Sequence, residues 1–276
     1  MTWHAQLDLT YRLQQERSVV YPAHSGPLRV LQSLYPEGPA ICHNVLVHPP
    51  GGLVGGDTLA MHIDVGSGAH ALVTTPGATR FYRSTGQRAS QTLQAKLAPH
   101  ARLEWLPLEA IAHDQCQAEN RAIFELAPGA ELMGWDVTAL GLPAAQLPFR
   151  HGSFTQHLEI PGVWLEQGRL LAQDTRLMDG PLGLAGHRCL ATLFFAAGEP
   201  LTRARRELAL ANMHELLQTC NLRGSAGVTS PHEQVLVLRV LAPLVEPAMQ
   251  LLQAARMVWR ETLWGLHSPA PRIWAT

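Results

Sequence analysis

The amino-acid sequence predicts a mainly β protein in which stacked β-sheets form a β-helix-like scaffold, followed by two α-helices near the C-terminus. Three observations lead to this prediction: apolar residues that alternate along the chain before residue 200, a loose internal repeat, and a change of composition after residue 200. We expect residues 1–276 to form a single domain, with a β-rich scaffold over residues 1–200 and an α/β C-terminal element over residues 201–276.

Alternation of apolar and polar residues predicts the first strands. Apolar residues occupy every second position from Leu59 to Val65, and similar patterns start at Gln91 and at Ala122. A period of two is typical of a strand with one buried face.

An internal repeat predicts that the strands are stacked. Ala69, Ala101 and Ala130 each precede an apolar residue by two positions, and their spacings are 32 and 29 residues. A period near 30 that contains a turn and strands favours a β-helix or layered sheets. Unrelated β-hairpins would give the same loose repeat and remain the alternative.

After residue 200 the pattern becomes helical. Residues 203–220 are rich in Leu, Ala, Glu and Arg, which favour helices, and residues 235–241 read as a buried strand. Apolar residues then recur at steps of three and four from Ala248 to Leu266, with Pro247 near the start and Gly265 near the end. This spacing predicts a second helix with one apolar face.

Composition excludes several classes of function. The net charge of −1 gives no electrostatic footprint for nucleic acid, and no apolar run is long enough to cross a membrane. The N-terminus has no secretory signal, so we expect a cytoplasmic protein whose four cysteines are free thiols. No pair of histidines has the spacing of a tight metal site, although His62 and His70 can converge if they flank a hairpin.

The run HPPGGLVGGD over residues 48–57 cannot form a regular helix. Two interpretations remain open, a tight turn between buried strands and a backbone cradle for a ligand. The glycine spacing differs from that of a dinucleotide fingerprint, and no Lys-Ser or Lys-Thr follows to complete a phosphate loop. We expect Gly55 or Gly56 to adopt a positive φ.

Motifs of common enzymes are absent, but several carboxylates lie beside the glycine run or beside tryptophans. The sequence contains no nucleophile elbow and no paired-histidine zinc motif. Glu104 and Asp136 each lie next to a tryptophan on an apolar strand, so they are either hydrogen-bonded, exposed on a half-buried strand, or directed into a wet channel. For Asp57, which ends the glycine run, capping of a backbone donor is the simple alternative.

Several motifs in order resemble the UreD-type urease accessory protein family. They are the glycine run, TTPGATRFYR at residues 74–83, LEWLP at residues 103–107, GWD at residues 134–136 and PRIW at residues 271–274. Arg80, Leu108 and Ala110 depart from the residues that the family usually carries. The resemblance nominates the following motif residues for structural or partner-binding roles: Gly51, Gly52, Gly55, Gly56, Thr74, Thr75, Tyr82, Arg83, Trp105 and Glu109.

The resemblance implies a chaperone and scaffold without catalytic activity, which binds apo-urease and the accessory proteins UreF and UreG, the latter a GTPase. It also implies a water-filled passage for nickel, with no cofactor permanently bound and with Asp57, Glu104, Asp136 and Glu166 as candidate steps. Two alternatives are a carbohydrate-active hydrolase or lyase that uses two of these carboxylates, and a β-rich assembly module with no role in metal transfer.

Overall fold

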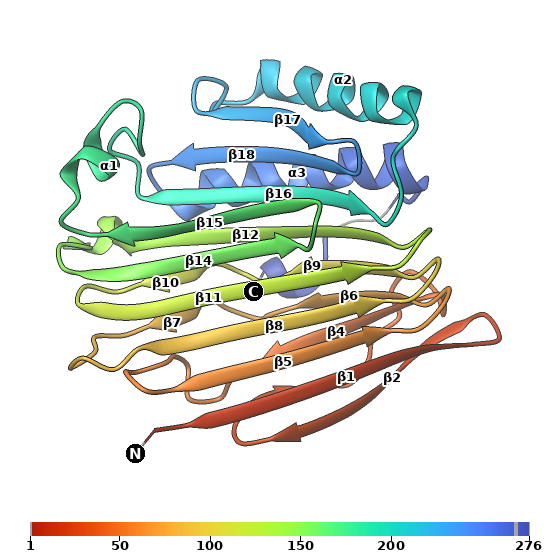
Figure 1. The fold of residues 1–276 in the computed structure, drawn as a ribbon, viewed down its shortest axis with the longest axis horizontal. Helices are drawn as coiled ribbons and strands as arrows, with labels where there is room; N and C mark the ends of the chain where they lie inside the picture. Colours follow the sequence, from red (N-terminus) through yellow and green to blue (C-terminus); the bar gives the residue numbers. More distant parts are fainter. Residues whose placement is uncertain (1, 268–269, 276) are drawn as a thin grey trace.

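The computed structural model describes residues 2–267 and 270–275, and these form two large β-sheets that face each other, with helices on one side (Figure 1). The predicted mainly β scaffold with C-terminal helices is therefore confirmed. In the described residues, no helix has both the length and the apolar character needed to span a bilayer.

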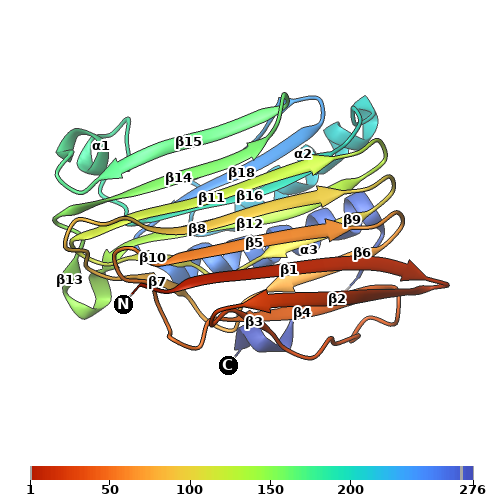
Figure 2. The same ribbon diagram turned by 60° about the horizontal axis from the view of Figure 1, so that its bottom comes forward.

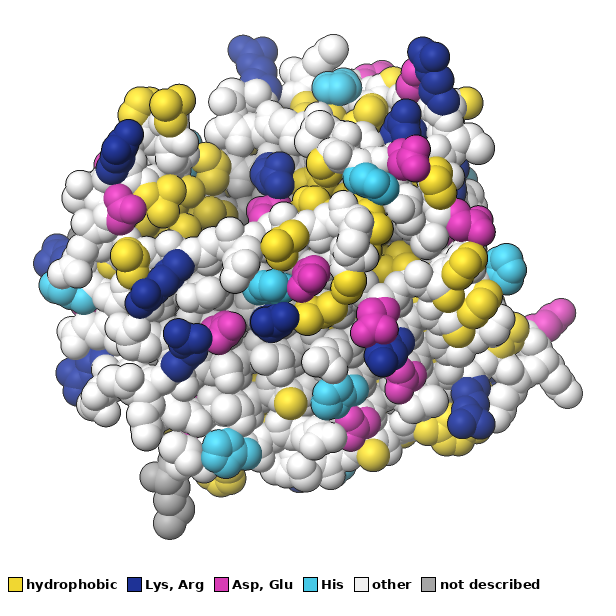
Figure 3. Space-filling view, in the orientation of Figure 1, with side chains coloured by type: hydrophobic (Ala, Val, Ile, Leu, Met, Phe, Trp, Pro, Cys, Tyr) yellow, Lys and Arg dark blue, Asp and Glu magenta, His cyan; other side chains and the backbone are white. Residues whose placement is uncertain are grey.

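One sheet has seven strands. Their order across the sheet is β15 (Trp164–Leu171), β14 (Gly152–Ile160), β11 (Cys116–Leu126), β8 (Ala89–Leu97), β5 (Thr58–Val65), β1 (His4–Gln14) and β2 (Arg17–Ser25). On the outer face of this sheet, acidic, basic and histidine side chains are interspersed, and neither sign of charge dominates (Figure 3).

The second sheet has eleven strands. Its main path is β17 (Ala226–His232), β18 (Val235–Ala242), β16 (Cys189–Ala197), β12 (Glu131–Leu142), β9 (Arg102–Leu106), β6 (His70–Thr74), β4 (Ile41–Val47) and β3 (Arg29–Val30), with β7 (Thr79–Phe81), β10 (Ala110–Ala112) and β13 (Leu147–Pro148) beside it. The C-terminal strands β16 and β18 thus continue the sheet that the scaffold begins.

The repeated alanines mark the corners where the chain passes from one sheet to the other. Ala69, Ala101 and Ala130 are fully buried, and each donates its N–H to the carbonyl three residues earlier at 3.0 Å. The residue before each alanine has a positive φ (70° at Gly68, 61° at His100, 73° at Gly129), as the third residue of a type II turn requires.

Stacking of these corners makes the scaffold a β-solenoid. Strands β5, β8, β11 and β14 pair in parallel in one sheet, and β4, β6, β9 and β12 pair in parallel in the other. The Ala69 carbonyl accepts a hydrogen bond from Arg102 N, and the Ala101 carbonyl accepts one from Glu131 N, both at 2.9 Å. The period near 30 residues is therefore one coil of the solenoid, and the alternative of unrelated hairpins is wrong.

Both predicted C-terminal helices are present and cover the outer face of the eleven-stranded sheet (Figure 2). They are α2 (Arg203–Thr219) and α3 (Val245–Trp264), and α3 ends at Gly265 in the left-handed conformation. The shorter elements are α1 (Thr175–Asp179), η1 (Pro143–Ala145) and η2 (Arg272–Ala275). The sequence analysis did not single out the β1–β2 hairpin or α1. Strand β1 nevertheless has buried residues at every second position from Ala5 to Tyr11, whereas most of β2 and α1 is exposed.

Candidate functional site

A row of polar side chains lies between the two sheets, where the surrounding residues are apolar. Gln91, Asn120 and Gln156 are direct neighbours in the register of β8, β11 and β14, and all three lie on the inner face of the seven-stranded sheet. Asp136 of β12 meets them from the opposite sheet. The row therefore crosses the interior of the solenoid from one sheet to the other.

Hydrogen bonds connect the row into one network. Gln91 Nε2 donates to Asn120 Oδ1 at 3.2 Å, and Asn120 Nδ2 donates to Asp136 Oδ2 at 2.9 Å. Gln156 Nε2 donates to Asp136 Oδ1. All four side chains are only half-buried although their strands lie inside the fold, so part of each faces space that protein does not fill. Polar groups in an apolar interior are costly unless they are hydrogen-bonded or hydrated, and the hydrogen bonds of this row meet the first of these conditions.

Asp136 is the charged centre of the row. Burial raises the pKa of its carboxyl to about 7, and the negative charge of Glu166 adds to the increase. Hydrogen bonds from Thr138 and Gln156 act in the opposite direction but are weaker. The carboxyl therefore exchanges its proton near neutral pH, so small changes at the site alter its charge.

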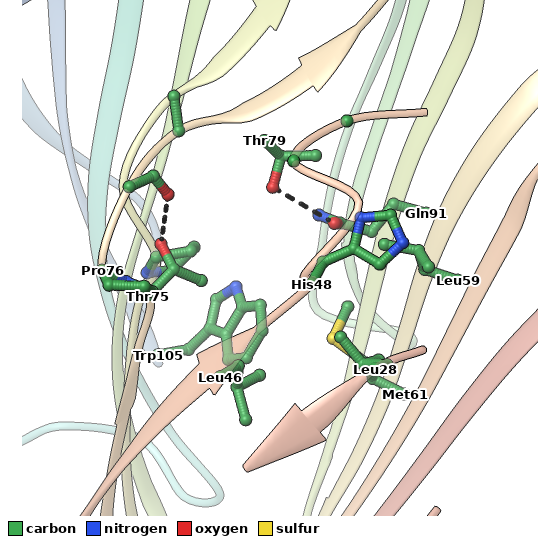
Figure 4. A pocket seen from close by; sticks show the side chains of 15 residues that line it. Leu28, Leu46, His48, Leu59, Met61, Thr75, Pro76, Thr79, Gln91 and Trp105 are labelled. Atoms are coloured by element: carbon green, nitrogen blue, oxygen red, sulfur yellow. Dashed lines mark hydrogen bonds between the residues drawn. The ribbon is translucent and has the colours of Figure 1, made fainter. Parts of the chain in front are cut away.

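One end of the row reaches a cavity of about 210 Å³ beside the glycine run (Figure 4). Gln91 lines this cavity and also donates to Asn120, so it joins the cavity to the row. In Figure 4, His48 and Gln91 lie on one side of the cavity, and Trp105 and Thr75 lie on the other. Gly51 and Gly52 form part of the wall, where their lack of side chains leaves room.

The glycine run pairs with the segment that contains β7. Leu53 N donates to Arg80 O at 2.7 Å, and Tyr82 N donates to Leu53 O at 2.8 Å. A Cβ at Gly52 would lie 2.3 Å from the ring of Tyr82, and one at Gly55 would lie 2.3 Å from the hydroxyl of Ser84. The run is therefore a close-packed turn that also forms part of a cavity wall, so both interpretations of the motif apply.

The expectation of a positive φ at Gly55 or Gly56 is confirmed at Gly56, where φ is +94°. A Cβ there would also lie 2.7 Å from Gln87 Oε1. We expect Gly56→Val to lower the free energy of unfolding by more than about 1 kcal/mol because the backbone becomes strained. Gly77→Ala is the control, because Gly77 has an ordinary φ and no close neighbours. Equal urea midpoints for the two variants would contradict this expectation.

Thr74, the last residue of β6, and Thr75, which follows it, hold neighbouring coils together. Thr74 Oγ1 donates to Leu106 O at 2.6 Å and accepts a hydrogen bond from Trp274 Nε1 at 2.8 Å. Thr75 Oγ1 accepts one from Leu108 N at 2.8 Å. The TTPG, LEWLP and PRIW motifs thus contact one another, and these contacts are structural.

The remaining motif residues differ in their exposure. Trp105 is buried and lines the cavity, the ring of Tyr82 packs 4.8 Å from that of His113, and Arg83 is exposed. Glu109 is half-buried, and burial, together with the charge of Glu246, raises the pKa of its carboxyl. These residues therefore do not converge on one point.

Asp57 and Glu104 are both occupied by protein partners. Asp57 is buried, and its two oxygens accept hydrogen bonds from Trp3 N at 2.7 Å and Val54 N at 2.9 Å. Glu104 is fully buried and forms ion pairs with Arg256 at 2.6 Å and Arg260 at 2.9 Å. The structure thus places Asp57 in a backbone cap and Glu104 beneath α3, both away from the polar row.

The charge of Glu104 is balanced from several sides. Burial alone would raise the pKa of its carboxyl, but Arg256, His70 and Arg260 together hold that pKa well below its usual range. Arg260 also donates to Glu37 Oε2 at 2.9 Å. The cluster fixes α3 to the sheet, and two arginines fill the space that a cation would need.

Glu166 lies near Asp136, at the other end of the row from the cavity. It is on β15, the edge strand of the seven-stranded sheet, and its Oε2 accepts hydrogen bonds from Arg239 Nη2 at 2.6 Å and Arg239 Nε at 3.2 Å. The Glu166 side chain is 26% exposed, so this end of the row reaches solvent. Of the four carboxylates that the sequence nominated, the structure therefore brings together only Asp136 and Glu166.

The row contains three residues that the sequence analysis did not single out as functional. Gln91, Asn120 and Gln156 occupy positions in their strands that the alternating pattern reserves for apolar side chains, each two residues before a buried one: Leu93, Ala122 and Leu158. An amide side chain at a strand position where the alternation predicts an apolar residue could have identified these three residues from the sequence.

The histidines and cysteines do not form a metal centre in the part of the chain that the structure describes. No group of three or more His, Cys, Asp or Glu residues there is arranged to hold a metal ion. His62 faces Asp8 on the outer surface, whereas His70 lies beneath α3 beside Glu104, so the two do not converge. The four cysteines are free thiols.

Comparison with known proteins identifies the family. The model of the UreD urease accessory protein family matches residues 4–275. The urease accessory protein UreD of Paracidovorax citrulli is 64% identical over 275 residues, and that of Albidiferax ferrireducens is 63% identical over 275 residues. The protein of the same name from Variovorax paradoxus is 60% identical over 276 residues, and all three alignments cover 100% of both chains. The predicted family and the predicted non-catalytic role are confirmed: this chain belongs to the UreD family of urease accessory proteins.

Proposed function

We propose that this chain is a chaperone and scaffold for urease maturation, and that nickel passes through its interior on the way to apo-urease. It acts in the cytoplasm, in a complex with a UreF-type protein and a UreG-type GTPase. The observation that supports nickel passage is the polar row that runs from the cavity through Asp136 to Glu166.

The chemistry of the row suits an ion in transit. It offers amide and carboxylate oxygens, and it includes neither a thiolate nor an imidazole. Oxygen ligands hold a borderline ion such as Ni²⁺ less tightly than sulfur or several imidazoles would. The row is therefore suited to passing the ion on, and nickel is a cargo of this protein with no permanent site.

Asp136 and Glu166 are the steps that we retain from the four carboxylates. Both are half-buried. Asp136 is held by the neutral side chains of Asn120 and Gln156, and Glu166 by a half-exposed arginine, whereas Asp57 caps backbone donors and Glu104 is paired with two buried arginines. If the carboxylate of Asp57 or Glu104 left its partners to bind an ion, backbone donors or buried arginines would remain unpaired.

The alternative of a carbohydrate-active enzyme finds no support in the tryptophans. Such a site would present aromatic side chains to solvent along one face, but Trp105, Trp135 and Trp259 are buried. Membership of a family of accessory proteins also argues against it.

The proposal is tested by assembling urease with and without this chain. We expect the chain to co-purify with the UreF-type protein and apo-urease, and urease assembled without it to contain little nickel. Urease that acquires its full nickel content in the absence of the chain would contradict the proposal.

The isolated chain is expected to hydrolyse neither GTP nor ATP. The sequence has no phosphate loop with its Lys and its Mg²⁺-binding Ser or Thr, so the energy of hydrolysis must come from a partner. Phosphate release by the purified chain is the measurement. Turnover that disappears on mutation of a residue of this chain would contradict the prediction.

A further inference from the structure

The contact between Glu166 and Arg239 closes the end of the polar row that lies opposite the cavity. Glu166 is on β15, at the edge of the seven-stranded sheet, and Arg239 is on β18 of the other sheet. Both Nε and Nη2 of Arg239 donate to Glu166 Oε2, at 3.2 and 2.6 Å. The pair therefore bridges the two sheets where the row reaches the surface.

Glu166 lies between a buried carboxyl and an exposed cation. Its charge acts on Asp136 from one side, and Arg239 pairs with it from the other. When all three groups are ionised their charges sum to −1, whereas Asp136 and Glu166 alone would offer −2. A divalent cation at these two carboxylates must therefore compete with Arg239.

The contact is exposed enough to open. The Arg239 side chain is 51% exposed and that of Glu166 is 26% exposed, and exposed ion pairs contribute little to stability. The Glu104 cluster is different, because Arg256, Arg260 and Glu104 are at most 1% exposed. Arg239 can thus leave its carboxylate at small cost, and the arginines beneath α3 cannot.

We propose that Arg239 is a removable counter-ion that controls access of cations to Asp136 and Glu166. While its guanidinium lies on Glu166, this end of the row is closed to Ni²⁺, and its departure frees the carboxylate to accept the ion. Arg239 acts through Glu166 and is a positioning residue. This inference rests on the proposed passage of nickel through the row.

The test is Ni²⁺ binding to the full-length chain, measured by equilibrium dialysis. Removing one positive charge beside the site is expected to tighten Ni²⁺ binding by about tenfold in Arg239→Gln. Arg239→Lys keeps the charge and should bind as the wild type does. Arg239→Met keeps the apolar stem for packing and should show the same gain as Arg239→Gln, which covers the case in which the glutamine variant does not fold.

Two further variants connect the gain to this site. In the double variant Glu166→Gln/Arg239→Gln the gain should be lost, because the carboxylate that binds the ion is absent. Arg88→Gln is the matched control, because Arg88 pairs with Glu119 at 2.8 Å with side-chain exposures of 58% and 24%, close to those of Arg239 and Glu166. This control should bind Ni²⁺ as the wild type does.

Wild-type Ni²⁺ binding in both Arg239→Gln and Arg239→Met, or a gain that persists in the double variant, would overturn the role of Arg239. The effect of Asp136→Leu on the nickel content of urease separates this failure from failure of the passage itself. If Asp136→Leu prevents nickel transfer while the Arg239 variants bind normally, the passage stands and the inference about Arg239 is wrong. If Asp136→Leu has no effect, the passage is wrong as well.

Discussion

Glu104→Ala is expected to lower the free energy of unfolding by about 3–5 kcal/mol, because it leaves Arg256 and Arg260 buried without their shared carboxylate. Burial of an unpaired charge costs far more than loss of an exposed contact. The three side chains connect the eleven-stranded sheet to α3, so the variant should also loosen the helix. Urea unfolding followed by circular dichroism at pH 7 measures the change.

Glu119→Ala is the control for that experiment. Glu119 also pairs with an arginine, Arg88, but on the exposed outer face of the other sheet, so its removal should cost at most about 1 kcal/mol. Equal losses of stability in the two variants would show that the Glu104 cluster does not hold the fold together as described.

The stability of the wild-type protein is expected to fall as the pH rises toward 7, in part because of Asp136. The pKa of this carboxyl is about 7 in the folded protein and has an ordinary value of 3.8, so the folded state holds the proton more tightly. This contribution to stability is fully present below pH 4 and is lost as the pH rises to about 7. Between pH 5 and pH 8 the loss amounts to about 2–3 kcal/mol.

Asp136→Asn removes this dependence, because the amide does not ionise. The difference in unfolding free energy between variant and wild type should therefore shift in favour of the variant by about that amount from pH 5 to pH 8. Asp64→Asn changes an exposed carboxylate and controls for the loss of one charge. A constant difference between Asp136→Asn and the wild type across this range would show that the pKa of Asp136 is not raised.

The architecture was largely predictable from the sequence because the solenoid repeats its local chemistry. The alanines at the corners and the residues of positive φ before them recur once per coil, so the period of the turns is visible along the chain. Helices α2 and α3 were also predictable, the first from its composition and the second from its apolar face. Both signals are local, and each depends on residues that are close in the chain.

The candidate site was less predictable because it depends on contacts between distant coils. Glu104 and Asp136 look alike in the sequence, since each lies beside a tryptophan on an apolar strand. The partners of Glu104 are 152 and 156 positions away on α3, whereas Asp136 faces amides from the opposite sheet. The residues around a carboxylate in the sequence indicate only loosely which face of the strand its side chain occupies. They do not identify partners that are distant in the sequence.

The nickel content of urease matured with Asp136 variants of this chain tests the central claim most directly. With Asp136→Leu, the claim predicts a folded chain that still assembles with its partners, while the nickel content of urease falls toward the level obtained without the chain. Asp136→Ala should have a smaller effect, because it removes the charge without obstructing the row. Full nickel content with both variants would contradict passage of nickel through the interior, and loss of complex assembly would show that Asp136 is structural.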